Sequence, residues 1–280
     1  MTKAVQYDVD RLREILLDES RSKELVDFFV GKALDPEPDD DPRFLEWYKL
    51  AIETVALVNS KAIYIAAESP AERIFLASLV LAFLKADPFG LIIHQVMKDA
   101  DEEIPAYRQH YKEFKKFLEW WKEHKPSRDI DAYLDEQLVR GRIAPDEREL
   151  LRHFTFRYYH MTMSNSLHLS MQAPFPNVRV AGKSIRTDMY FWNPASDRIR
   201  LIVECDGFKY HSSQESFTAD RRRDRELQLR GFQVLRFAGT EIYHDPAGVS
   251  SELCKHLWAL QESVFDGPNQ PNEDESNQKD

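Results

Sequence analysis

Three acidic residues, Asp188, Glu204 and Asp206, lie in two neighbouring segments that have the composition of β-strands. The segment NPASD between them predicts a turn. A turn centred near Ser196 places Asp188 opposite Glu204, because both are eight residues away from it. Side chains alternate between the faces of a strand, so Asp206 shares a face with Glu204, and Asp188 points to that face too. The spacing predicts three carboxylates on one patch of an otherwise apolar sheet.

Carboxylates placed together repel one another, and proteins usually tolerate this where a cation lies among them. Hard oxygen ligands suit Mg²⁺ or Mn²⁺. Such an ion lowers the pKa of a bound water and neutralises charge that builds on a phosphate, as phosphodiester hydrolysis requires. A second interpretation stays open, because acids on a solvated edge strand can instead pair with Arg186, Arg198 and Arg200.

Strands must position these acids, and three are predicted from β-forming residues, at Asn177–Ala181, Ile185–Trp192 and Ile199–Asp206. Ser212 and Glu215 form a possible capping box for a helix that Gly231 ends. The segment FQVLRFA predicts a fourth strand, and a last helix follows Pro246.

Helical periodicity dominates the rest of the chain, with helices predicted over residues 8–34, 43–59 and 69–85 and, inside an insert at about 86–165, over 106–124. Ser69 is the expected N-cap of the third helix, with Pro70 in its first turn. An acidic, proline-rich linker occupies residues 35–42, and residues 266–280 are expected to be disordered.

The net charge of −10 is a poor guide to the partner of the predicted sheet. Residues 35–41 and 266–280 together contribute −9, whereas residues 179–236 have a net charge of +4. Two cysteines are too few for a disulfide framework or a cysteine-rich zinc site. Neither a membrane span nor a signal peptide is evident, so we expect a cytoplasmic protein without membrane contact.

The segments Arg186-Thr-Asp188 and Ile202-Val-Glu204-Cys-Asp206-Gly207, followed by His211, resemble the core of the PD-(D/E)XK nuclease superfamily. They are most similar to the branch related to very-short-patch-repair endonucleases. The resemblance extends to the helix start Ser69-Pro70-Ala71-Glu72, to Gln172, and to a later set of residues comprising Asp220, Arg223, Asp224, Leu227, Gly231 and Val234-Leu-Arg236.

The resemblance implies an α/β fold with a restriction-endonuclease-like αβββαβ core and a mixed central sheet, to which N-terminal helices and the helical insert are added. It implies that Asp188 and Glu204 ligate the metal, with the backbone carbonyl of Cys205 as a possible further ligand. Asp206 stands where the superfamily usually has a lysine. Lys209 or His211 would then supply the missing cation or the proton-transferring group.

Two further candidates keep alternative interpretations. Glu72 is either an additional acid near the metal or a first-turn charge that the helix dipole favours. Gln172 either orients the water or a phosphate, or caps a strand. In the run that follows the proposed site, Arg221, Arg222 and Arg225 are candidates for phosphate contacts, unless they form a plain solvated helix face.

We therefore predict a Mg²⁺- or Mn²⁺-dependent endonuclease of bacterial repair, restriction or defence, acting on nucleic acid and most plausibly on DNA. The predicted domains are an N-terminal helical region at 1–66, a nuclease domain at 67–265 and the acidic tail at 266–280. Two alternatives are a catalytically inactive nuclease-fold module that binds nucleic acid or a protein partner, and a nuclease whose helical regions dock a protein partner that restrains it. The oligomeric state does not follow from the sequence.

Overall fold

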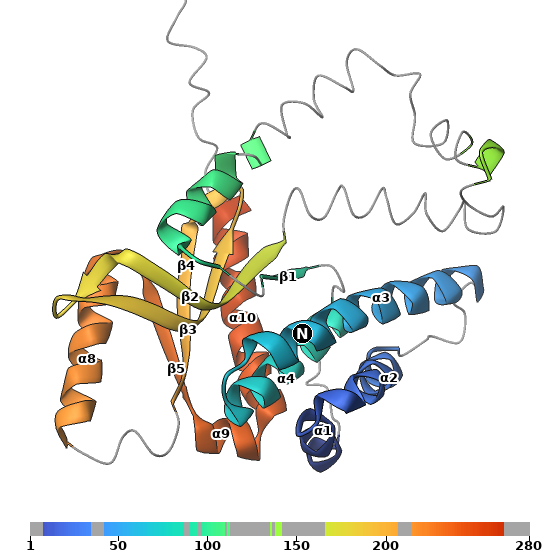
Figure 1. Cartoon of the computed structure of the whole chain (residues 1–280), viewed down its shortest axis with the longest axis horizontal. Helices are drawn as coiled ribbons and strands as arrows, with labels where there is room; N and C mark the ends of the chain where they lie inside the picture. The colour runs from blue at the N-terminus through green and yellow to red at the C-terminus, as the bar shows by residue number, and fades with distance from the viewer. Residues whose placement is uncertain are drawn as a thin grey trace, which may run out of the picture.

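A mixed five-stranded sheet forms the centre of the computed structural model (Figure 1), which describes residues 8–34, 42–86, 90–94, 97–109, 111–112, 135, 138–141, 166–206 and 214–265. The strands follow one another across the sheet in chain order: β1 (Leu91–His94), β2 (Leu167–Val180), β3 (Lys183–Asn193), β4 (Ser196–Asp206) and β5 (Gln233–Ala238). The two outer pairs, β1 with β2 and β4 with β5, are parallel, whereas β2, β3 and β4 are antiparallel. The predicted α/β class with a mixed sheet is confirmed, with β1 as an added edge strand.

Helices surround this sheet, and their bounds are α1 (Val9–Leu16), the 3₁₀ turn η1 (Glu19–Arg21), α2 (Ser22–Ala33), α3 (Pro42–Ala66), α4 (Pro70–Ala86), α8 (Gln214–Leu229), α9 (Gly239–His244) and α10 (Pro246–Phe265). In Figure 1, α1, α2 and α3 lie on one side of the molecule, and α8 lies on the other, beneath the far part of the β2–β3 hairpin. None of the helices among the described residues combines the length and apolar character that a bilayer crossing requires.

Several predicted boundaries were wrong. The helix predicted over 8–34 is interrupted at Asp18, whose carboxylate accepts the Ser20 N–H and starts a 3₁₀ turn. Helix α3 continues through the apolar segment after Asn59 to Ala66. The helix expected at 106–124 already begins at 100, where Asp99 accepts first-turn N–H groups; its predicted end lies outside the described residues.

Two strands of the sheet also differ from the prediction. Strand β1 is only four residues long and lies inside the segment predicted to be helical, and such short apolar runs cannot be assigned by periodicity. Strand β2 begins at Leu167, ten residues before the predicted start. Its Pro174 and Pro176 argue against a strand interior, which explains the error.

Helix α4 is almost entirely buried because it packs against α10 and α9 as well as against the N-terminal helices α1, α2 and α3. Its Phe75 packs against Phe237 of β5 with ring centroids 5.2 Å apart, and the same apolar core contains Leu12 of α1 and Met189 of β3. The opposite sheet face packs against α8, through Leu227, and against the helix at 100–109. Because helices pack on both faces of the sheet, the start of α4 and the middle of α8 lie near the same ends of the strands.

Candidate active site

The hairpin register aligns four polar residues across the sheet. Met189 pairs with Val203 as the sequence predicted, so Asp188 and Glu204 face each other one residue further along. On the β2 side, the pairs on either side of Gln172 place it opposite Asp188. On the β5 side, Glu204 pairs with Arg236. The residues Gln172, Asp188, Glu204 and Arg236, here called the polar row, come from four adjacent strands.

Gln172 has an unusual backbone conformation, with a φ of 49° inside strand β2. An L-residue in this left-handed region costs on the order of 1–2 kcal/mol. The strand changes face at this residue: Met171 belongs to the core shared with α4, whereas Ala173 and Phe175 belong to the core shared with α8. The strain thus accompanies a switch of faces beside the acids, and regular strand alternation does not predict it.

The side chain of Gln172 joins β2 to the first turn of α4. Its Nε2 donates to Glu72 Oε2 at 2.8 Å, and Glu72 is only 6% exposed. Glu72 Oε2 also accepts the Glu68 N–H, and the Glu72 N–H donates to the Ser69 hydroxyl, which is the predicted helix cap. Because a carboxylate only accepts hydrogen bonds, the amide nitrogen must face Glu72. Gln172 Oε1 is consequently left buried without a hydrogen-bond donor.

Asp188 is held by the backbone of the neighbouring strand, since its Oδ2 accepts the Cys205 N–H at 2.8 Å. The pKa of Asp188 is raised to about 6, mainly by burial; the charges of Glu72 and Asp206 add to this rise, and the Cys205 N–H and Arg223 oppose it. The acid is therefore destabilised as an anion by its surroundings.

Glu204 is also buried, with 7% of its surface exposed, and its Oε1 accepts from Arg223 Nη2 of α8 at 3.0 Å. Burial raises the pKa of Glu204 to about 7; Arg223 opposes this rise, and the charge of Asp188 adds to it. The same Arg223 nitrogen donates to the Arg186 carbonyl. Arg223 thus orients the carboxylate and ties α8 to β3.

Asp206 has a different environment from the other two acids. Its Oδ1 accepts from Arg236 Nη1 at 2.8 Å, and the remaining guanidinium nitrogens of Arg236 donate to Asp224 of α8. Arg236 therefore stands between two acids and beside Glu204 in register. The sequence placed Asp206 on the face of Glu204, but its pairing with a cation from β5 was not foreseen.

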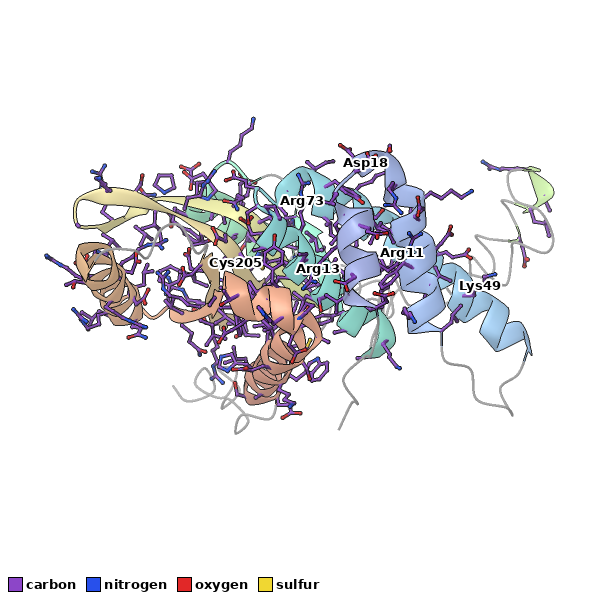
Figure 2. The ribbon with its side chains drawn as sticks, turned by 90° about the horizontal axis from the view of Figure 1, so that it is seen from below. Arg11, Arg13, Asp18, Lys49, Arg73 and Cys205 are labelled. Atoms are coloured by element: carbon purple, nitrogen blue, oxygen red, sulfur yellow. The ribbon has the colours of Figure 1, made fainter. Side chains whose placement is uncertain are left out.

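Four acids converge on the region of Cys205, which Figure 2 labels near the middle of the molecule. After burial, the charges of Asp188, Glu72, Glu204 and Asp206 are the causes that raise the pKa of its thiol. Among the described residues, no group of three or more acidic, histidine or cysteine side chains is close enough to hold a metal ion. The acids thus share one electrostatic environment without forming a closed coordination shell.

Helix α8 presents its arginines to two sides. Arg223 and Asp224 face the sheet, whereas Arg221, Arg222 and Arg225 are exposed. Arg222 pairs with Glu226, one turn further along, at 3.1 Å. Arg223 and Asp224, which belong to the family pattern, thus brace α8 against the sheet. Lys209 and His211 lie outside the described residues.

The comparison with protein families adds an independent observation. Residues 170–257 match the family model REase_MTES_1575. This is a restriction-endonuclease-like family, and the match supports a nuclease superfamily for the segment from β2 to α10. The matched segment contains the whole polar row, whereas Glu72 lies outside it. No significant match was found among curated proteins or solved structures.

The donor chemistry of the site fits a hard divalent cation. Asp188 and Glu204 are adjacent acids whose pKa values are raised by burial, and the charge of Asp188 adds to the rise at Glu204; Gln172 adds a buried oxygen without a donor. All three are oxygen ligands of the kind that Mg²⁺ and Mn²⁺ accept. Arg223 and Arg236 were known from the sequence only as parts of a family pattern. Charge alternation around α8 is a sequence signal for Arg223, whereas no local pattern signals the contacts of Arg236 on β5.

Proposed function

We propose that this restriction-endonuclease-like segment is the active part of a metal-dependent endonuclease that hydrolyses phosphodiester bonds in DNA. The observation that carries the proposal is the pair Asp188 and Glu204, two mutually repelling acids held in register beside the strained Gln172. Buried acids that destabilise one another are typical of functional sites. The family match supports the nuclease class of this assignment.

Asp188 and Glu204, together with the backbone carbonyl of Cys205, would hold Mg²⁺ or Mn²⁺. When bound, such an ion supplies an activated water at neutral pH and neutralises charge on the phosphate. Gln172 Oε1 accepts a hydrogen bond from the attacking water, and Glu72 holds the amide in the required orientation. Arg223 keeps Glu204 oriented through Oε1. Asp206 acts on the site by fixing Arg236 beside Glu204.

Two further groups have roles in this proposal. Lys209 or His211 would assist proton transfer or stabilise charge, since both follow β4 directly in the chain. The exposed Arg221, Arg222 and Arg225 would contact substrate phosphates. Charge-based contacts of this kind position a nucleic acid without reading its sequence.

The test is incubation of plasmid DNA, single-stranded DNA and RNA with the purified protein in Mg²⁺ or Mn²⁺. We expect DNA cleavage by the wild-type protein and a loss of roughly a thousandfold or more in Asp188→Asn and Glu204→Gln, as for removal of a central catalytic group. Asp197→Asn, an exposed acid at the start of β4, is the matched control. Cleavage that persists in both active-site variants would contradict the proposal.

A second candidate function is supported by the contacts of the same acids. Arg223, Arg236, Gln172 and the Cys205 N–H each hold one of the four carboxylates. This pattern is compatible with a nuclease fold that binds nucleic acid or a protein partner without catalysis. Calorimetric titration of the folded protein with Mn²⁺ separates the candidates, because absence of binding would favour the inactive module.

We also propose that the segment belongs to the very-short-patch-repair branch and acts in bacterial repair, restriction or defence. The residues of that resemblance have identifiable contacts: Arg223 and Asp224 hold Glu204 and Arg236, and Leu227 is fully buried under the sheet. Gly231 has a φ of 81°, which suits the residue after a helix end. Comparing cleavage of mismatched and fully paired duplexes tests the repair assignment.

A further inference from the structure

We propose that the outer part of the β2–β3 hairpin is a second phosphate-binding element, an arm that carries the nucleic acid away from the active site along α8. The arm comprises residues 179–186. It holds three basic residues, Arg179, Lys183 and Arg186, and no acid. All three basic residues are exposed. This inference extends the proposed nuclease function, on which it rests for the identity of the ligand.

The backbone of the arm, rather than its side chains, makes the hydrogen bonds that attach it to α8. Arg223 donates to the Arg186 carbonyl at 3.1 Å, Glu226 accepts the Ala181 N–H at 3.2 Å, and Arg230 donates to the Arg179 carbonyl at 2.7 Å. Figure 1 shows α8 alongside this part of the hairpin. Because backbone atoms make these contacts, the docking does not neutralise the side-chain charges of Arg179 and Lys183. Two attachments to α8 and a third to Arg230, directly after the helix end, also hold the arm in a defined position.

The position of the arm relative to the acids sets its reach. Lys183 precedes Asp188 by five residues on strand β3, which corresponds to about 16 Å along an extended strand. At about 3.4 Å per base pair, this distance covers roughly five base pairs of a duplex. Arg186, between the two, is paired with Glu68 through two hydrogen bonds of 2.8 and 2.7 Å. The outer cations, Arg179 and Lys183, are therefore those that contact phosphates.

The chemistry of the arm favours a duplex backbone over exposed bases. Residues 179–186 include no aromatic side chain, and stacking on aromatic rings is the usual way to bind single-stranded bases. Lysine and arginine side chains suit phosphate oxygens and bind independently of sequence. The arm would thus increase affinity for duplex DNA without adding sequence preference.

The experiment measures binding of a fluorescent duplex of about 20 base pairs by anisotropy in EDTA, so that cleavage does not enter. Titrations at several NaCl concentrations compare wild type with the double variant Arg179→Gln/Lys183→Gln. The control double variant, Arg198→Gln/Lys49→Gln, removes the same charge elsewhere: Lys49 lies on α3, far from the hairpin in Figure 2, and Arg198 lies beside Ser263 of α10. Thermal unfolding verifies that both variants are folded.

We expect the arm variant to bind more weakly and its slope of log K against log salt to decrease in magnitude by about 1.8, for two lost phosphate contacts. The control should keep the wild-type slope. Equal slopes for the two variants, or no duplex binding by wild type, would overturn the arm. If the arm variant binds DNA normally and the wild-type protein cleaves it, the arm is wrong and the proposed function stands. If binding depends on the arm but the wild-type protein cleaves no DNA, the proposed function is wrong and the arm stands.

Discussion

Strands β2 and β3 contribute to two groups of polar and aromatic side chains that differ in electrostatic character. One is the polar row with Asp188 and Gln172. The other, here called the histidine–tryptophan cluster, consists of His94, Tyr107, His168 and Trp192, with His168 paired to Trp192 across the strands. The cluster begins four residues from the polar row on each strand, about 13 Å along the sheet. Each group contains a deeply buried titratable residue, Glu204 in the row and His168 in the cluster, and these two respond differently to burial.

The cluster responds to burial by becoming neutral. Burial lowers the pKa of His168 to about 3, so the imidazole carries no charge at ordinary pH. Its Nδ1 lies 2.8 Å from His94 Nε2, and the Trp192 indole donates to the Ser170 hydroxyl at 2.9 Å. The ring centroids of His168 and Trp192 are 4.5 Å apart. These contacts describe a packed and hydrogen-bonded core.

The acids of the polar row, in contrast, are destabilised by their surroundings. Asp188 and Glu204 have pKa values raised by burial, and charge adds to the rise: that of Glu72 and Asp206 at Asp188, and that of Asp188 at Glu204. Gln172 adds backbone strain and an unsatisfied oxygen. Unfavourable terms that accumulate around adjacent acids, whereas the imidazole of the cluster is neutral, indicate that ligand binding rather than packing accounts for the row.

Replacing Trp192 by alanine is expected to give the largest effect on stability. The indole is fully buried, and loss of such a side chain costs about 3–5 kcal/mol. Denaturant unfolding should show this loss. The folded fraction should still bind Mn²⁺ with wild-type affinity in calorimetry, because the cluster contains none of the proposed ligands. Loss of Mn²⁺ binding at an unchanged folded fraction would remove the distinction between the two groups.

Divalent metal should stabilise the wild-type protein by neutralising the polar row. At a concentration 100 times the dissociation constant, one bound ion adds about 2.7 kcal/mol to the free energy of unfolding. Unfolding in Mn²⁺ and in EDTA measures this difference. Asp188→Asn should lose it, whereas His168→Gln, a change in the neutral cluster, should retain it despite lower stability. A stabilisation that survives Asp188→Asn would place the metal elsewhere.

The pH dependence of stability in EDTA should separate the groups further. The pKa of Asp188 is raised from 3.8 to about 6 in the folded protein. Its contribution to stability is therefore fully present below pH 3.8 and is lost as the pH rises through 6. Asp188→Asn should abolish this loss and be more stable than wild type at pH 8 by roughly 1–3 kcal/mol. The asparagine oxygen can still accept the Cys205 N–H. Denaturant unfolding at pH 4 to 8 gives the comparison, and parallel curves for the two proteins would refute it.

The backbone strain at Gln172 predicts the smallest effect. Gln172→Ala and Gln172→Gly both remove the hydrogen bond to Glu72. Glycine accepts a φ of 49° without the steric penalty. The glycine variant should thus be more stable than the alanine variant by about 1 kcal/mol, which reverses their usual order in a strand. Both should cleave more slowly than wild type. The usual order in chemical denaturation would show that the strain is absent.

Short-range patterns account for the parts of the site that could be predicted from the sequence. Asp188 and Glu204 belong to one hairpin, so their register depends only on the turn between them. This register is kept despite an irregularity in the strand pairing next to the turn, between Trp192 and Asn193. The cap formed by Ser69 and the first-turn position of Glu72 likewise follow from neighbouring residues. Apolar alternation and turn residues act over a few positions, which is why the sequence alone determined these features.

Only the tertiary structure decided what each acid contacts. Glu72 meets Gln172 across 100 residues, and the partner of Asp206 comes from β5, 30 residues away. The positive φ of Gln172 lies where β2 passes from one core to the other. The ion pairs of Arg223 with Glu204 and of Asp224 with Arg236 form only because α8 packs against the sheet with one particular face. Such contacts reflect the simultaneous burial of several elements, which no local pattern encodes.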